Sequence, residues 1–501
     1  MRIASFFLIA LLASCGRTYP PASEQSLSLP PIAPDYCDVV MPRNMALPSF
    51  TVEGTTHLRA EIDCEGEQVT LEGEEIALEE LRGVVDRNLR HPKAPKTPKV
   101  PKTPAESAAT LTVTLSAWSP SHPDGIRYAP FTVTLSPDTI DRFLTYRLIP
   151  PGYEGWHSMG IYRRDLTSFE ETPLVTISNS QDGCVNCHTS CWGDARRYLY
   201  HRRGEGGGTV FSVDGVERMV NLKALGLQGS YPAWHPSGRY VAFASTDTHQ
   251  GFYHSSRDKI EVYDLGGKMF VYDLERGEEI LDTRFRDSTL WHTFPAFSPD
   301  GRTLYYCRAR AVIMPHQADS LHYELIAADF DPQTAQLGEE RIIPIPQSEE
   351  KQSQSLPPAE SHQSQSLPPI GGSRRGVVGD RSISFPRVSP DGRYLMVTVA
   401  DCGTFPIWHK EADLAMIDLA TGTAVDLSAV NSDDVESFHS WSRNSRWVVF
   451  SSRRSDGRYT RLFFSHIDAE GNASKPFLLP QSSPSHNIMR LDSYNVPILE
   501  E

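Results

Sequence analysis

The chain has 501 residues, with 63 acidic against 48 basic side chains and a formal net charge of −15. Nucleic acid attracts positively charged surfaces, so this charge and the lack of a basic stripe exclude nucleic acid as an expected partner. The length is sufficient for one large all-β domain and a smaller one.

The N-terminus has the pattern of an export signal. Arg2 precedes an apolar stretch, and Leu12-Ala13-Ser14-Cys15 resembles the lipobox of bacterial lipoproteins. The resemblance implies a signal peptide over 1–14 and lipidation at Cys15; an ordinary secretory signal with an incidental cysteine is the alternative. Gly16 favours the outer membrane, facing the periplasm. No other stretch approaches the ~20 apolar residues of a membrane span.

A tether and a small domain are expected next. Residues 15–35 are rich in Pro and Ser, which predicts a tether. Short alternating segments over 36–142 predict a small β-rich domain, although residues 75–89 have the spacing of one amphipathic helix. A Pro/Lys run at 91–104 indicates a solvated loop. Whether Cys37 and Cys64 form a disulfide is left open.

The region 143–485 repeats one pattern. Strand, tight turn and strand recur around Ser298-Pro-Asp-Gly-Arg302 and Ser389-Pro-Asp-Gly-Arg393, with two further copies beginning at Tyr231 and His439. Four strands per repeat describe a propeller blade. The repeats resemble the TolB-like (WD40-like) family, which implies an all-β fold with about six blades. A low-complexity loop is expected at 347–375 and a C-terminal tail at 486–501.

One motif within the repeats carries recognisable chemistry. Cys184-Val-Asn-Cys187-His188 is the C-x-x-C-H signature of covalent c-type haem attachment. The two thiols would form thioethers with the haem, and His188 would be the proximal iron ligand. A zinc site that adds Cys191 is the alternative, although adjacent ligands at 187 and 188 are poorly spaced for it. A redox C-x-x-C is disfavoured because no βαβ pattern surrounds it.

The repeat alignment predicts the surroundings of the haem. It places the motif in a loop that enters an innermost strand at the channel mouth. It also places His201 in the column of Phe243, Tyr306, Val397 and Phe450, where an imidazole needs a partner. His201 is therefore a candidate sixth iron ligand or a packed core histidine. Met159, His292 and His439 are its rivals.

Around the motif, the sequence is similar to a family of bacterial propeller lipoproteins that carry C-x-x-C-H-S/T before a Tyr-His-x-Arg segment. The residues that match are Cys184, Cys187, His188, Tyr200, His201 and Arg203, with Tyr231-Pro-Ala-Trp-His-Pro236 downstream. This resemblance implies the fold and one haem c, but no reaction. We expect a redox protein that transfers electrons to a periplasmic partner or reduces a small molecule at the haem. A protein partner on the propeller face is the alternative partner. The alternative is a non-enzymatic binding or scaffold propeller with a structural or sensory haem.

Overall fold

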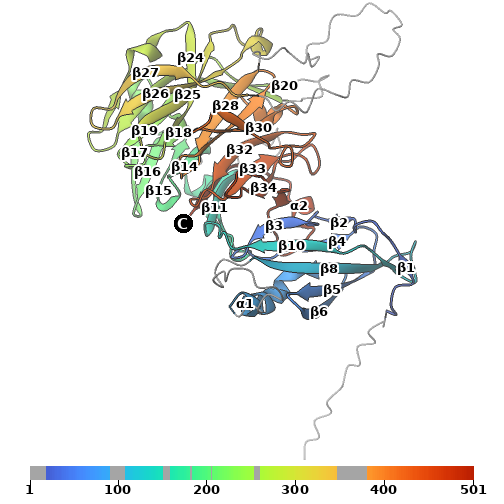
Figure 1. Cartoon of the computed structure of the whole chain (residues 1–501). Coiled ribbons are helices and arrows are strands. Elements are labelled where there is room, and N and C mark those ends of the chain that lie inside the picture. The colour runs from blue at the N-terminus through green and yellow to red at the C-terminus, as the bar shows by residue number, and fades with distance from the viewer. Residues whose placement is uncertain are drawn as a thin grey trace, which may run out of the picture.

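A computed structural model describes residues 19–90, 108–150, 158–180, 183–204, 206–252, 260–346 and 381–501. It contains a β-propeller and a smaller N-terminal β-rich unit, so the expected all-β class is confirmed (Figure 1). The signal peptide with Cys15, the Pro/Lys loop and the low-complexity loop lie outside the described residues. Within the described ranges, no helix is long and apolar enough to cross a membrane.

The N-terminal unit is built on a seven-stranded sheet whose inward side chains alternate along its strands. In β8, Leu111, Val113 and Leu115 are fully buried. The sheet comprises β1 (Glu24–Gln25), β3 (Val39–Pro42), β5 (His57–Cys64), β6 (Glu67–Gly73), β8 (Ala109–Trp118), β9 (Ile126–Arg127) and β10 (Phe131–Ser136). A three-stranded sheet comprises β2 (Ile32–Ala33), β4 (Ser49–Val52) and β7 (Ile76–Ala77).

Two sequence expectations for this unit are refined. Strands β1 and β2 lie inside the stretch expected to be a tether, so part of that stretch belongs to the folded unit. The amphipathic segment forms η1 (Leu78–Leu81) and α1 (Arg82–Arg90). Cys37 and Cys64 are free and have different neighbours: Cys37 lies 3.8 Å from the Pro30 carbonyl, and Cys64 accepts a hydrogen bond from Asn88.

Among the described residues, six four-stranded antiparallel sheets form the blades of the propeller. From the innermost strand outward, the first three are β36 (Ser493–Glu500), β11 (Phe143–Ile149), β12 (Gly160–Asp165) and β13 (Glu171–Thr176); β14 (Val185–Cys191), β15 (Asp194–Arg202), β16 (Gly208–Val213) and β17 (Val216–Val220); and β18 (Ser230–Trp234), β19 (Tyr240–Ser245), β22 (Lys268–Asp273) and β23 (Glu278–Ile280).

Blades 4 to 6 continue the ring. They are β24 (Leu290–Phe297), β25 (Thr303–Arg310), β26 (Glu324–Asp331) and β27 (Gln336–Ile342); β28 (Ser382–Val388), β29 (Tyr394–Ala400), β30 (Asp413–Asp418) and β31 (Thr423–Val425); and β32 (Glu436–Trp441), β33 (Trp447–Ser452), β34 (Arg461–His466) and β35 (Phe477–Leu478). Short helices η4 (Ile177–Asn179), η5 (Leu222–Leu225), η6 (Thr283–Arg286), η7 (Ala318–Ser320), η9 (Pro406–Trp408) and α2 (His486–Met489) lie between strands.

The Ser-Pro-Asp-Gly-Arg motif has a physical role in the turn between the first two strands of blades 4 and 5. In blade 4, the Ser298 hydroxyl donates to the Asp300 carboxylate, which also accepts the Arg302 N–H at 3.0 Å. Gly301 has a φ of 69°, a conformation that glycine adopts without steric cost. Blade 5 repeats these bonds with Ser389 and Asp391. The motif therefore fixes the turn through its own side chains.

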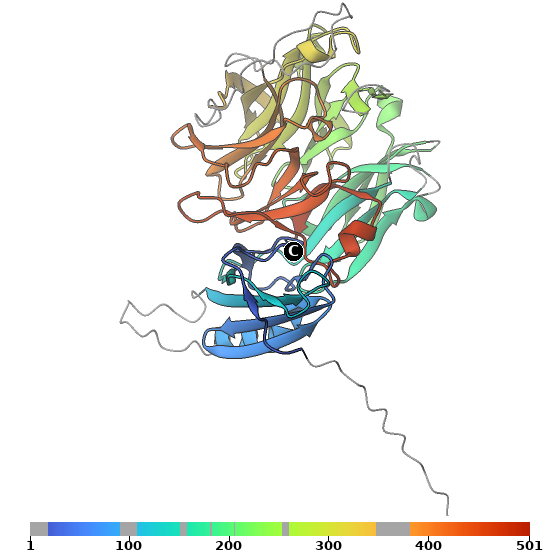
Figure 2. The ribbon, with the colours of Figure 1, turned by 90° about the vertical axis from the view of Figure 1, so that its right-hand side faces the viewer.

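The C-terminal segment closes the ring. Residues 486–501 are not a free tail, because β36 pairs with β11 as the innermost strand of blade 1. Leu499 is 2% exposed, and the buried Glu500 carboxylate accepts hydrogen bonds from Thr145 at 2.7 Å and Arg163 at 2.9 Å. The chain end thus joins the first blade to the last, and it lies at the junction with the N-terminal unit (Figure 2).

The two units share one hydrophobic core. Buried side chains of β8 and β10 belong to the same cluster as Leu144 of blade 1 and Trp447 of blade 6. At this contact, Asp138 accepts the Trp447 indole N–H at 3.0 Å through its carbonyl and contacts His466 at 2.7 Å through its carboxylate. The N-terminal unit is therefore packed against blades 1 and 6 (Figures 1 and 2).

A hairpin inserted in blade 3 reaches across to blade 5. Its strands, β20 (Thr248–Phe252) and β21 (Ile260–Asp264), lie between β19 and β22 in the sequence. Glu261 contacts the His409 ring at 3.2 Å just after η9, and His409 also contacts Glu411 at 3.3 Å. Because blade 4 separates these two blades, the hairpin spans part of the mouth at which the innermost strands begin.

Candidate functional site

The C-x-x-C-H motif lies in the innermost strand of blade 2. The six innermost strands contact one another around the channel in the order β14, β18, β24, β28, β32 and β36. Cys184 immediately precedes β14, and residues 185–188 belong to the strand itself. The expectation of an entry loop was wrong because β14 already begins at Val185 and ends at Cys191, where Trp192 and Gly193, both at positive φ, form a two-residue turn.

Each innermost strand has a β-bulge at the same position. The pairing register with the second strand shifts there, and one residue adopts a left-handed conformation, with φ between 48° and 52°. These residues are Cys187, Tyr231, Phe294, Phe385, Phe438 and Val496. None is glycine, and left-handed backbone costs other residues roughly 1–2 kcal/mol, so the surrounding fold must enforce the bulges.

The bulge residues form a ring in which Cys187 stands out. The rings of Tyr231 and Phe294 are 4.6 Å apart, those of Phe294 and Phe385 are 4.3 Å apart, and those of Phe385 and Phe438 are 5.0 Å apart. Such separations are typical of favourable aromatic pairs. In blade 2, Cys187 occupies the position at which four other blades have an aromatic side chain.

The residue after the bulge distinguishes two blades from the other four. It is Pro232, Pro295, Pro386 and Pro497 in four blades, but His188 in blade 2 and His439 in blade 6. Burial lowers the pKa of both histidines to about 3, so both are neutral at neutral pH. His439 has a partner, the Met396 carbonyl at 3.1 Å from its Nε2.

His188 lacks the corresponding hydrogen bond. The backbone of Thr145 occupies the place of Met396, and it and the backbone of Val496 lie near enough to His188 to raise its pKa. Neither ring nitrogen, however, reaches full hydrogen-bond geometry with a partner among the described residues. His188 is nevertheless buried, with only 4% of its surface exposed. Unpaired buried polar groups are costly and rare, so an imidazole with two unused nitrogens is a candidate ligand.

Both thiols lie beside His188 on one cavity. Cys184 and Cys187 are free, and they line with His188 a channel cavity of about 1580 Å³. This exceeds the ~300–1,000 Å³ of ordinary ligand pockets. Met159, which precedes β12, lines the same cavity, and its sulfur is 3.4 Å from that of Cys184. Burial raises the pKa of the Cys184 thiol, whereas nearby Arg147 and Arg203 lower it.

His201 does not occupy the predicted column. Tyr200 pairs with Val210 in blade 2 as Phe243 pairs with Phe270 in blade 3, so Tyr200 is the equivalent residue. The short turn at Trp192 makes blade 2 shorter than the alignment assumed, and a one-residue slip moves a side chain to the other face of the sheet. The His201 Nδ1 lies 3.3 Å from the Thr209 hydroxyl, and burial lowers its pKa to about 4. His201 is not among the residues that line the cavity.

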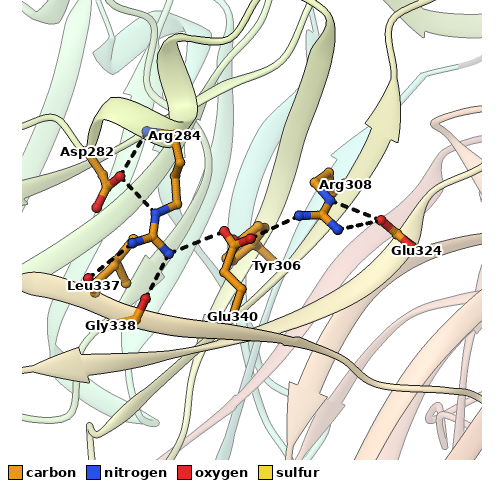
Figure 3. Close-up of polar contacts among 8 residues, drawn as sticks. All are labelled: Asp282, Arg284, Tyr306, Arg308, Glu324, Leu337, Gly338 and Glu340. Atoms are coloured by element: carbon orange, nitrogen blue, oxygen red, sulfur yellow. Dashed lines mark hydrogen bonds and ion pairs between the residues drawn. The ribbon is translucent and has the colours of Figure 1, made fainter.

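His292 is also removed from the motif. It packs against Phe285 and Tyr306 inside blade 4, with ring centroids 5.0 and 5.8 Å away. Beside it, Tyr306 bonds to Glu340, which also contacts Arg308 at 2.9 Å and Arg284 at 3.3 Å (Figure 3). His292 therefore belongs to the packing of this blade.

Cys191 is separated from the other motif residues by its packing. It belongs to a core cluster with Leu199 and Trp234, and its sulfur lies 3.8 Å from the His235 carbonyl. Within the described ranges, no group of three or more His, Cys, Asp or Glu side chains is placed to hold a metal ion. The four residues expected for the zinc alternative are therefore not assembled.

Two residues that sequence reasoning missed complete the surroundings. Arg147 of β11 lies close enough to the motif to lower the pKa values of Cys184 and His188. Asn186 is buried, and its amide nitrogen is 3.8 Å from the Cys184 sulfur. A buried asparagine inside the motif was a readable signal, whereas Arg147 is near only because β36 and β14 bring blade 1 against blade 2.

The residues present fit a c-type haem in their donor chemistry. The attachment needs two free thiols and an available imidazole, and Cys184, Cys187 and His188 supply these on one cavity. Met159 adds a thioether, the second ligand type found in cytochromes c. The cavity extends along the channel past the aromatic ring, which leaves space next to the cysteines.

Comparisons with known proteins concern the fold alone. No family model matches the sequence, and no curated protein matches it. Among solved structures, TolB from Acinetobacter baumannii is 12% identical, covers 77% of this chain and 78% of its own, and has a TM-score of 0.43. The β-propeller domain of the Trilobed protease from Pyrococcus furiosus is 11% identical, and the match covers 56% of this chain and 82% of that domain, with a TM-score of 0.29. The chain is thus similar to β-propeller proteins that include TolB.

Proposed function

We propose that this protein is a lipid-anchored β-propeller of the cell envelope that carries one covalent haem c in its channel and uses it for redox chemistry. Cys184 and Cys187 would hold the haem through thioethers, and His188 would be the proximal ligand. The observation that carries the proposal is the buried imidazole of His188, which has no partner at full hydrogen-bond geometry among the described residues, beside two free thiols on one large cavity.

The comparison of His188 with His439 sharpens this proposal. The two residues occupy equivalent positions, but among the described residues only His439 has a carbonyl partner at full hydrogen-bond geometry, whereas Thr145 and Val496 approach His188 less favourably. A histidine that serves packing alone would be expected to have the same bond in both blades. Blade 2 differs from blade 6 in having Cys187 instead of Phe438 at the bulge, so the unpaired histidine and the thiol occur together.

Met159 is the sixth-ligand candidate with the best support. Its sulfur contacts the motif directly, whereas His201 and His292 lie inside their blades and His439 is bonded to Met396. A thioether ligand raises the reduction potential of a haem relative to a second histidine. We therefore expect a relatively high-potential centre.

The haem would supply one-electron chemistry at iron, and the propeller would control access to it. The aromatic ring borders the site on the channel side, and the β20–β21 hairpin narrows one mouth. Electron transfer and reduction of a small molecule are distinguished by one measurement on the loaded protein. Rapid cyanide or nitrite binding with turnover indicates an enzyme, and indifference to these ligands indicates electron transfer.

The envelope location rests on the N-terminal sequence. The apolar segment that ends at Cys15 is too short to anchor the protein by itself, so lipidation of Cys15 would provide the anchor. An exported protein would also meet the cytochrome c maturation machinery, as the motif requires.

Covalent attachment is the direct test. The protein should stain for haem on a denaturing gel only when it is co-expressed with cytochrome c maturation genes. Cys184→Ala and Cys187→Ala should each reduce the staining, whereas Cys307→Ala, a buried thiol in blade 4, should not. Unstained, folded wild-type protein made with those genes would contradict the proposal.

A further inference from the structure

Arg147 is half-buried, lines the cavity and places a positive charge beside the cysteine motif. Burial lowers the pKa of its guanidinium, and the charged or titratable groups that act on it are Cys187, Cys184 and Arg203. None of these is a carboxylate. Its Nε is buried and has no hydrogen-bond partner among the described residues. The nearby cation, Arg203, increases the positive potential instead of balancing it.

Several other arginines with low exposure are compensated by partners within the protein. Arg163 pairs with Glu500 at 2.9 Å, and Arg454 pairs with Glu436 at 2.8 Å. Arg461 donates to three backbone carbonyls. Arg387 lines the same cavity as Arg147 and also has only a thiol, Cys307, acting on it, but it donates to the Pro386 carbonyl at 2.9 Å. An unpaired charge with little access to water is costly, so Arg147, whose Nε has no partner among the described residues, is a candidate for binding a group that enters the cavity.

Arg203 acts on one carboxylate, that of Asp264, but this carboxylate already has other hydrogen-bond partners. Asp264 of β21 is buried, with its pKa raised by that burial to about 6, and Arg203 has only a small opposing influence on it. Its oxygens accept hydrogen bonds from the Thr248 hydroxyl at 2.6 Å and the Tyr231 hydroxyl at 3.1 Å. Asp264 is therefore engaged with the hairpin and the aromatic ring, and both arginines still face the cavity.

We propose that Arg147 and Arg203 bind an oxygen anion, a carboxylate or phosphate-like group, beside Cys184 and Cys187. Guanidinium groups suit this role because their donors match two oxygens of such an anion. The anion has two possible sources: a carboxylate of the haem itself, which rests on the proposed function, or a free small oxoanion, which does not.

The first experiment uses the folded chain made without maturation genes and inorganic phosphate as the probe. Titration calorimetry should detect binding to the wild type and at least a tenfold weaker affinity for Arg147→Gln. Arg147→Lys should keep part of the affinity. Arg443→Gln is the matched control, because Arg443 lines the same cavity but is exposed and paired with Glu501; its affinity should equal that of the wild type.

The second experiment repeats the titration with haem-loaded protein and measures the reduction potential. If phosphate no longer binds and Arg147→Gln lowers the potential, the haem carboxylate is the anion. If phosphate still binds, the site is for a free oxoanion. If phosphate does not bind to the unloaded chain and Arg147→Gln leaves the potential unchanged, the inference is overturned. Phosphate binding by a chain that never acquires haem would refute only the proposed function.

Discussion

Leu499→Ala tests whether the C-terminal strand closes the propeller. Leu499 lies on β36, is 2% exposed, and belongs to the core shared by blade 1, blade 6 and the N-terminal unit. Leu-to-Ala changes at such sites cost about 2–5 kcal/mol, from lost burial and the cavity that remains. With about 3 kcal/mol lost, the urea midpoint should fall by about 1 M.

Leu491→Ala is the matched control. Leu491 lies just before β36, and its side chain is 60% exposed. Its replacement should change stability by less than about 0.5 kcal/mol. Urea unfolding of both variants, followed by far-ultraviolet circular dichroism, gives the comparison directly. Equal midpoints for both variants and the wild type would show that residues 493–500 are not part of the propeller.

Four further predictions follow from individual contacts. Burial lowers the pKa of His409, but its bonds to Glu261 and Glu411 raise the pKa to about 10. The protonated ring therefore stabilises the fold fully below pH 6.5, and this contribution disappears as the pH rises through 10. His409→Gln should lower the melting temperature at pH 6 but not at pH 10.5. Cys191→Ser should leave haem staining unchanged, because Cys191 packs between strands; lost staining would give it a role in the site. His201→Phe should leave the absorption spectrum of the haem unchanged, since His201 lies against Thr209 inside blade 2; a change to a high-spin spectrum would restore it as a ligand. Cys15→Ala should move the protein from the membrane fraction to the soluble or unprocessed fraction, and a wild type that fatty-acid labelling does not mark would refute lipidation.

The propeller was predictable because its turns are local. Ser298 and Asp300 satisfy the turn with their own side chains, so the motif can be read without knowledge of distant residues. The closing strand β36 was missed because it pairs with β11, more than 300 residues earlier, and has no such turn. Long-range pairing of this kind leaves only a weak alternating pattern in the sequence.

The motif residues of the candidate site could be named from the sequence, but their neighbours in the fold could not. The motif named Cys184, Cys187 and His188, which the structure brings to one cavity. The two-residue turn at Trp192 shifted the alignment by one residue, which was enough to assign His201 to the wrong face. Arg147 was missed because only the packing of blade 1 on blade 2 brings it to the motif.

The pyridine haemochrome spectrum of purified protein, produced in the periplasm with maturation genes, tests the central claim most directly. The account predicts the spectrum of a haem with two thioether bonds, at one haem per chain. His188→Ala should lower the haem content or make the native spectrum high-spin, while the equivalent change at His439, which has its own carbonyl partner, should do neither. A colourless wild type, folded and exported but without bound haem, would contradict the account.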